Sequence, residues 1–184
     1  MWVFDIKTDH LENVVRFRAR IVARGDKQRP GINYVETFSP VARMAIFRLF
    51  VAVCVQLELP IYQDDINTAY LNATLGIKQY LESLEGYPCK MKNTIYVINK
   101  ALHGLKQSGR EWNSEVNVWF VNFGFEQCRT EPYLYYYRRD GEFAIVLLYV
   151  DDILCATKNV DFKTNMFHKL DKDYRLKDQD FINT

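Results

Sequence analysis

The sequence predicts an α+β fold in which helices back a mainly antiparallel sheet. Strand-like segments follow one another across short turns, the clearest being Asp140-Gly141 between two apolar stretches, and such hairpins require antiparallel pairing. Segments with apolar residues at helical spacing lie between these hairpins. Strands and helices in this arrangement are expected to form a sheet with the helices on one side.

The composition is that of one globular domain. Of the 184 residues, 48% are apolar and 26% are charged, which is too apolar for a disordered chain. The four cysteines stand far apart without the paired spacing of a zinc site, and the longest uncharged apolar run, 143–150, is too short for a membrane span. We therefore expect a soluble intracellular protein with no membrane partner.

The N-terminal segment is expected to form a hairpin, with a strand over 2–7, a polar turn at 9–13 and a second strand over 14–25. A period of two places four arginines on one face of the second strand, while the apolar face is expected to pack. The net charge of the chain is only +1, so this local positive charge is either a phosphate-binding surface or a solvated edge. The arginines are Arg16, Arg18, Arg20 and Arg24, and the apolar residues are Phe17, Ala19, Ile21 and Ala23.

The next part of the sequence predicts a helix, a short strand and a second hairpin. Ser39-Pro40 has the form of a helix start, and apolar residues then recur at helical spacing to near Glu58. Residues 61–65 form a short strand that ends in two acids, and the segment 66–74 turns into a short helix. Residues 79–84 and 93–100 are expected to pair as a hairpin.

The second half of the sequence predicts two more helices and three strands. Ser108 and Glu111 have the spacing of a capping box, and the helix that follows ends at Gly124. Segments 133–139 and 142–150 form a hairpin, and 142–150 is apolar on both faces, as in a central strand. Residues 153–157 form a third strand, and 159–174 form an amphipathic helix.

Asp151 and Asp152 interrupt the apolar strands of this region. Both carboxylates would emerge at one rim of the sheet, where repulsion raises the pKa of at least one of such a pair unless a cation holds both ionised. An Asp-Asp pair is also ordinary turn chemistry. If the strand over 61–65 lies beside the hairpin, Asp64 or Asp65 adds a third carboxylate. Three such ligands suit Mg²⁺, or two ions about 4 Å apart that serve phosphoryl chemistry.

Several separated stretches resemble the reverse transcriptase of copia-type retrotransposons. They occur in the family's order and span almost the whole chain: RFRARIVARG, YVETFSPVARM, QDDINTAYLN, YLESLEGY, NKALHGLKQS and LLYVDD. The resemblance implies the fingers and palm of a right-hand polymerase, with the thumb absent. Residues of about 1–58 and 76–106 are implied to be fingers-like, and residues of about 59–75 and 107–184 palm-like. Asp26 and Gly109 depart from the family's usual pattern.

The resemblance also assigns roles to individual residues. QDDINTAYLN matches the family's first catalytic motif at Asp65 and not at Asp64, and YVDD supplies Asp151 and Asp152. These three aspartates are implied to be the catalytic residues and the ligands of two Mg²⁺ ions, for which Mn²⁺ can substitute. Tyr70 is implied to be an aromatic gate that excludes ribonucleotides. Residues implied to bind the deoxynucleoside triphosphate are Arg18, Arg20, Ile66, Tyr70 and His103, and those implied to contact template or primer are Arg24, Gly104, Lys106 and Tyr149.

The implied activity is RNA-dependent DNA polymerisation, in which a primer 3′-hydroxyl attacks the α-phosphorus of a deoxynucleoside triphosphate and pyrophosphate leaves. The implied partners are an RNA or DNA template with its primer, the triphosphates, and the rest of a Gag-Pol polyprotein with integrase and RNase H. Such a protein would act in a cytoplasmic virus-like particle or in the nucleus. The alternative is a truncated, inactive retroelement remnant that at most binds nucleic acid.

Overall fold

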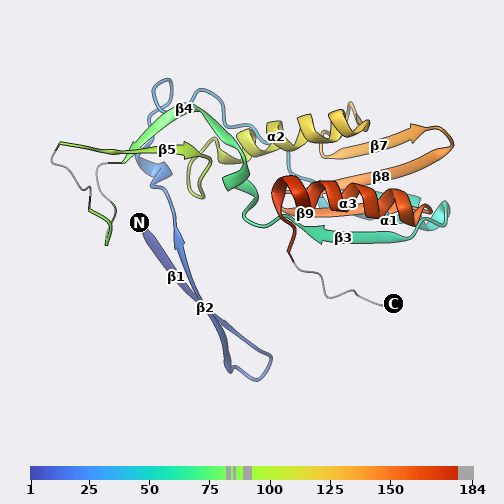
Figure 1. Cartoon of the computed structure of the whole chain (residues 1–184), viewed down its shortest axis with the longest axis horizontal. Coiled ribbons are helices and arrows are strands. Elements are labelled where there is room, and N and C mark those ends of the chain that lie inside the picture. The colour runs from blue at the N-terminus through green and yellow to red at the C-terminus, as the bar shows by residue number, and fades with distance from the viewer. Residues whose placement is uncertain (82–83, 85, 89–92, 178–184) are drawn as a thin grey trace.

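A five-stranded antiparallel sheet forms the centre of the structure. The computed structural model describes residues 1–81, 84, 86–88 and 93–177. The strand order is β3 (Ile61–Asp65), β9 (Asp152–Thr157), β8 (Glu142–Tyr149), β7 (Leu134–Arg139) and β6 (Glu126–Gln127), and Figure 1 shows the first four in this order. Every neighbouring pair is antiparallel. β8 is buried from Ala144 to Leu148, which confirms that it is a central strand.

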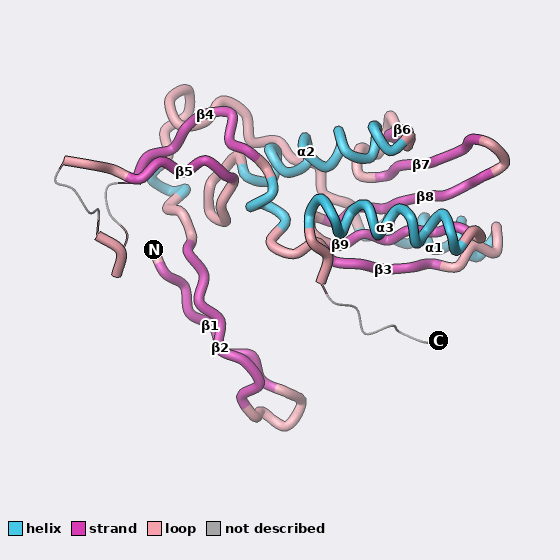
Figure 2. The backbone as a smooth tube through the Cα atoms, viewed as in Figure 1, coloured by secondary structure: helices cyan, strands magenta, loops and turns pink. Residues whose placement is uncertain are grey.

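Helices cover both faces of this sheet, so the expectation that they lie on one side is wrong. α2 (Ser108–Phe123) and α3 (Val160–Tyr174) share one core with residues of the sheet, whereas α1 (Met44–Gln56) shares a separate core with others (Figure 2). Val146 of β8 belongs to the first core and its neighbour Ile145 to the second. Because β8 is apolar on both faces, each face needs a covering layer. The mixed α+β class with antiparallel sheets is confirmed.

Two smaller sheets lie outside the central one. β1 (Trp2–Thr8) pairs with β2 (Val14–Ile21), and β4 (Thr74–Leu81) pairs with β5 (Tyr96–Lys100), so both predicted hairpins are confirmed. Residues 82–83 of the second predicted hairpin, and residues 178–184 at the end of the chain, lie outside the described residues. Figure 1 shows β1 and β2 extending together away from the rest of the chain.

The apolar face of the β1–β2 hairpin does not pack as expected. Phe4 is 75% exposed and Phe17 is 76% exposed. This face is partly buried only at the base of the hairpin, at Trp2, Ile21 and Ala23. The strand periodicity was sufficient to separate the basic and apolar faces, but the hairpin projects from the body, and its outer apolar residues therefore remain exposed.

The helix boundaries follow the sequence in part. α1 begins at Met44 and not at Ser39-Pro40, although Phe50 and Cys54 are buried as the apolar spacing predicts. α3 begins as expected, because the Asn159 side chain accepts a hydrogen bond from the Phe162 N–H. Among the described residues, no helix has both the length and the apolar content that crossing a lipid bilayer requires.

The predicted capping box of α2 is wrong, although the helix itself begins at Ser108 and its C-cap is Gly124 with φ of 114°. The Ser108 hydroxyl accepts a hydrogen bond from the Leu102 N–H and donates one to the Leu102 carbonyl. Glu111 accepts a hydrogen bond from the N–H of Gly76 in β4. Both side chains therefore join α2 to neighbouring segments and do not close its first turn.

Two glycines allow the end of β2 to contact the loop that precedes α2. Gly104 has φ of 92°, and a Cβ there would lie 2.2 Å from the carbonyl oxygen of Ala23. A Cβ on Gly25, in the short helix η1 (Gly25–Lys27), would lie 2.0 Å from the carbonyl oxygen of Gly104. The Ala23 N–H donates to the His103 carbonyl at 2.8 Å across the same contact. A side chain at either glycine would separate the two segments.

Candidate active site

Three aspartates come together at one end of the central sheet. Asp65, the last residue of β3, pairs with Asp152, the first residue of β9. Asp151 lies in the preceding turn, and its carbonyl accepts a hydrogen bond of 2.8 Å from the Ile66 N–H. Directly opposed residues of antiparallel strands have Cβ atoms about 5 Å apart. The carboxylates therefore gather where β3 ends, at the end of the sheet nearer the β1–β2 hairpin (Figure 1).

The register of β3 separates Asp64 from Asp65. Asp64 is opposite Ile153 in β9 and is buried, and its Oδ1 accepts a hydrogen bond of 2.8 Å from the Asp65 N–H. The Asp65 side chain is 29% exposed. Because successive strand residues point to opposite faces, only Asp65 shares a face with Asp152.

Trp112 fixes the turn that carries Asp151. Val150 has φ of 58°, which is uncommon for a β-branched residue and is strained. The indole Nε1–H of Trp112 on α2 donates to the Val150 carbonyl at 2.6 Å. The sequence analysis predicted the helix that carries Trp112 but no contact of its side chain with this turn. The hydrogen-bonding need of a buried indole was the signal for this further contact.

The pKa of Asp152 reflects the negative charge of the site. Burial raises the pKa of its carboxyl group, and the neighbouring carboxylates of Asp65 and Asp151 raise it further. A hydrogen bond of 3.2 Å from Gln63 Nε2 and the charge of Lys177 act in the opposite direction. Three carboxylates this close together repel one another, so the site favours the presence of a cation.

Lys177 supplies one positive charge. Its Nζ lies 2.5 Å from Oδ1 of Asp65, and that oxygen is shielded from solvent and has no aligned hydrogen bond. Within the described part of the chain, no three His, Cys, Asp or Glu side chains stand in this conformation where they could together hold a metal ion. The donor set nevertheless fits Mg²⁺, because the site offers carboxylate oxygens and one of them is buried and in need of a cation.

Tyr70 and His103 lie near enough to Asp151 for its charge to act on them, and Arg20 lies near enough to act on His103. The rings of Tyr70 and His103 have centroids 4.7 Å apart. Burial raises the pKa of Tyr70, as does the charge of Asp151. Burial also lowers the pKa of His103, Arg20 lowers it further and Asp151 opposes the shift, although His103 keeps an exposed surface. Arg20 additionally lies 3.8 Å from Asp5 of β1. The structure thus joins the hairpin, the short helix η2 (Ala69–Asn72) and the loop before α2 at one place.

The basic residues predicted to meet nucleic acid are partly engaged with neighbours. Arg18 lies opposite Asp5 on the same hairpin face as Arg20. Arg24 donates two hydrogen bonds, of 2.8 and 2.6 Å, to Asp26, so part of its charge is neutralised within the chain.

Of the remaining predicted contacts, Gly104, Lys106 and Tyr149 are exposed, and Ile66 is not. Tyr149 is exposed at the end of β8, and the ammonium group of Lys106 lies 5.5 Å from the centre of the Tyr34 ring. Ile66 is fully buried in the core, and its N–H is already bonded to Asp151. The Ile66 side chain thus packs in the core in this conformation, and its role in nucleotide binding stays a prediction.

A network of glutamines supports the loop before α2 and was not predicted. Gln28 Nε2 donates to the side-chain oxygens of Gln79 at 3.1 Å and Gln107 at 3.0 Å, and both of those residues are buried. Both also donate to the carbonyl of Asn33, and Gln28 accepts from the Lys106 N–H at 2.8 Å. These residues are far apart in the sequence, and the fact that they are polar does not predict that they contact one another.

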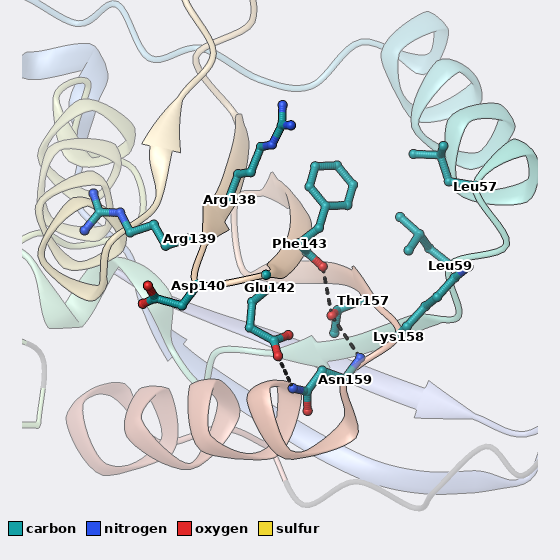
Figure 3. A pocket seen from close by; sticks show the side chains of 11 residues that line it. Leu57, Leu59, Arg138, Arg139, Asp140, Glu142, Phe143, Thr157, Lys158 and Asn159 are labelled. Carbon is teal, nitrogen blue, oxygen red and sulfur yellow. Dashed lines mark hydrogen bonds between the residues drawn. The ribbon is translucent and has the colours of Figure 1, made fainter.

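A cleft lies at the opposite end of the sheet from the aspartates. Its volume is about 990 Å³, and it is lined by the β7–β8 turn, the end of β9 and the segment from α1 to β3 (Figure 3). Asn159 donates to Glu142 at 2.6 Å across its floor. Since β8 begins at this end and reaches the aspartates only at its other end, the cleft is separate from the candidate site.

Comparison with known proteins agrees with these features. The whole chain, residues 1–184, matches the family described as reverse transcriptase (RNA-dependent DNA polymerase). It is 34% identical to the Retrovirus-related Pol polyprotein from transposon TNT 1-94 of Nicotiana tabacum, covering 96% of this chain and 14% of that protein. It is also 34% identical to the Pol polyprotein from transposon RE1 of Arabidopsis thaliana, covering 97% and 12%.

A more distant match is the Transposon Ty1-MR1 Gag-Pol polyprotein of Saccharomyces cerevisiae, which is 27% identical over 96% of this chain and 10% of that protein. No solved structure gives a significant match. The chain therefore spans a small part of the length of the polyproteins that it resembles. It belongs to the reverse transcriptase family, in the group carried by copia-type retrotransposon Pol polyproteins.

Proposed function

We propose that this chain is an RNA-dependent DNA polymerase domain that extends a primer 3′-hydroxyl with deoxynucleoside triphosphates. The observation that supports this most directly is the strand register that sets Asp65 beside Asp152, with Asp151 in the adjoining turn. When bound, two Mg²⁺ ions would lower the pKa of the attacking hydroxyl and neutralise the leaving pyrophosphate.

The three aspartates act in this proposal as the metal ligands, with Asp65 and Asp151 as the principal ones and Asp152 assisting. Two of them lie at the ends of paired strands, and Trp112 holds the turn that carries the third. Ligands on rigid elements keep their positions during the reaction, which reduces the reorganisation that the site must undergo.

The basic face of the β1–β2 hairpin binds the triphosphate in this proposal. Arg18 and Arg20 point from the same strand face, and Arg20 is near enough to His103 to change the pKa of its imidazole. Guanidinium groups make paired hydrogen bonds to phosphate, and these strengthen when the site closes and excludes water. Arg24 extends this basic face, with its charge moderated by Asp26.

Tyr70 acts as the gate against ribonucleotides, because its ring would leave no room for a 2′-hydroxyl. The contact with the His103 ring supports Tyr70 in this position. Gly104 and Lys106 are proposed to approach the template from the same loop, and the exposed Tyr149 is proposed to contact the primer.

We further propose that the central sheet is the palm of a right-hand polymerase and that the two smaller sheets belong to the fingers. The palm would comprise about 59–75 and 107–177, and the fingers about 1–58 and 76–106 of the described chain. α1 falls within the first of these fingers ranges, but it shares its core with the central sheet. It would therefore move with the palm.

The partners of the whole protein are also proposals, because the chain spans only 14% of the tobacco relative. The polyprotein would supply integrase and RNase H, and the substrates would be a primed RNA or DNA template and deoxynucleoside triphosphates. The place of action would be a cytoplasmic particle or the nucleus.

Primer extension tests the proposal. The full chain is incubated with oligo(dT) on poly(rA), dTTP and either Mg²⁺ or Mn²⁺, and product length is followed on a gel. We expect extension by the wild type and loss of extension in Asp151→Asn. Asp140→Asn is the matched control, because it makes the same change in the turn at the other end of β8 and should leave extension intact.

Equal behaviour of wild type and Asp151→Asn would contradict the polymerase proposal. Salt-dependent binding of the primed template without any extension would instead favour the inactive remnant, since phosphate contacts alone give such binding.

A further inference from the structure

The segment after α3 returns to the candidate site and lies beside the end of β3. Leu176 forms an antiparallel bridge with Ile66, and the Lys177 N–H donates to the Asp65 carbonyl at 2.9 Å. A second backbone hydrogen bond of 2.9 Å, from Asn67 to Arg175, lies on the other side of this bridge. The backbone of Lys177 is therefore held against the residue that its side chain contacts.

The chain reversal before Lys177 is also held in place. Asp171, in the last turn of α3, accepts hydrogen bonds of 2.9 Å from the N–H of Arg175, through its carbonyl, and of Leu176, through its side chain. Arg175 has φ of 56°, an uncommon value for a residue other than glycine, and Leu176 packs against the main core. A strained residue persists where its surroundings determine it, so the approach of Lys177 to Asp65 is a fixed feature of the fold.

The Lys177 ammonium group contacts the carboxylate oxygen of Asp65 that is shielded from solvent. Oδ1 of Asp65 is shielded from solvent, and the Lys177 ammonium group at 2.5 Å is its compensating charge. An ammonium group in contact with this oxygen repels a divalent ion that approaches the same carboxylate, so the two cations compete for Asp65. Lysine fits this role, since its ammonium is a compact charge on a flexible stem and can withdraw to solvent.

We propose that Lys177 is a built-in counter-cation that neutralises Asp65 while the site holds no divalent ion and that leaves Asp65 when an ion binds. This inference rests on the proposed function, because it takes the three aspartates to be metal ligands. It explains why aspartates that are adjacent in the sheet do not form a coordination set in the described structure. It also makes the metal affinity of the free protein lower than the three carboxylates alone would give.

Titration with Mn²⁺ tests the inference without measuring catalysis. The full-length wild type is compared with Lys177→Met, which keeps the stem and removes the charge, and with Lys177→Arg, which keeps the charge. Lys172→Met is the matched control, because it removes an exposed lysine at the end of the same helix. Free Mn²⁺ is measured by electron paramagnetic resonance, and circular dichroism checks folding.

The expected result is an apparent Kd for Mn²⁺ about two- to fivefold lower in Lys177→Met than in the wild type, the upper part of the range that follows from a partly exposed ion pair. Lys177→Arg and Lys172→Met should stay within about twofold of the wild type. Amine labelling provides a second readout that needs no variant: Lys177 should become more reactive when Mn²⁺ is added, as mass spectrometry of the labelled peptide would show.

The outcomes separate this inference from the proposed function. If Lys177→Met and Lys172→Met bind Mn²⁺ equally well, or if labelling of Lys177 does not respond to Mn²⁺ that binds, the competition is absent and only this inference is overturned. If neither the wild type nor Lys177→Met binds Mn²⁺, the aspartates are not metal ligands and both proposals are overturned. If Lys177→Met does not fold, the labelling result decides.

Discussion

Replacing Trp112 by phenylalanine is a direct test of how the fold supports the candidate site. The change removes the Nε1–H that donates to the Val150 carbonyl at 2.6 Å, while it retains an aromatic ring in the core. Val150 has φ of 58° in the turn that precedes the two aspartates. Without this hydrogen bond, the strained turn loses one of the contacts that hold it, while the bond from Ile66 to Asp151 remains.

The expected loss of stability has two parts. An unpaired, partly buried carbonyl costs about 1–3 kcal/mol. The smaller ring leaves a void of roughly 40 Å³, worth about 1 kcal/mol at roughly 24 cal/mol per Å³. This void would join the cavity of about 90 Å³ that Trp112 and Val150 already line. We therefore expect the free energy of unfolding to fall by about 2–4 kcal/mol.

Urea denaturation followed by circular dichroism measures this difference. Trp119→Phe is the matched control, because Trp119 lies on the same helix and donates a hydrogen bond of 2.8 Å to Asp173 at an exposed site. There the loss should be about 0.5–1.5 kcal/mol. Primer extension should fall in Trp112→Phe and not in Trp119→Phe at a temperature where both variants are folded. Equal losses of stability and equal extension in the two variants would refute the view that Trp112 positions the turn.

Three further predictions concern the surroundings of the site. The pKa of His103 lies below its ordinary value of 6.5, so the free energy of unfolding should fall as the pH is lowered through 6.5 toward that lower pKa. His103→Gln should remove this pH-dependent part of the stability, as urea titrations between about pH 7.5 and 5.5 would show. Gly104→Ala should destabilise the chain by at least about 2 kcal/mol more than Gly141→Ala, because both positions have positive φ but only a Cβ at Gly104 meets the Ala23 carbonyl. Equal losses of stability in thermal denaturation would contradict this close contact. Tyr70→Val should raise the incorporation of ribonucleotides relative to deoxyribonucleotides in primer extension by at least about tenfold, and an unchanged ratio would remove Tyr70 from the gate.

Local patterns in the sequence were enough to predict most of the elements. The turn at Asp140-Gly141, the apolar run of β8 and the end of α2 at Gly124 each depend on residues close together in the chain. The positions of the aspartates followed from the same patterns, because each acid stands at the end of an apolar strand. Predictions failed where a residue had a distant partner, as with Ser108 and Glu111, which bond neighbouring segments and not the first turn of α2.

The sequence by itself determined which segments become strands and helices, that two acidic segments exist, and the family to which the chain belongs, because these properties depend on periodicity, turn chemistry and motif order. The family motif already selected Asp65 over Asp64, but only the tertiary structure decided that Asp65 faces Asp152, that α1 covers the second face of the sheet, and that Lys177 reaches Asp65. The physical reason is that these contacts join residues far apart in the chain. They are fixed by strand register and by the burial of both faces of β8, and neither can be calculated from a local pattern.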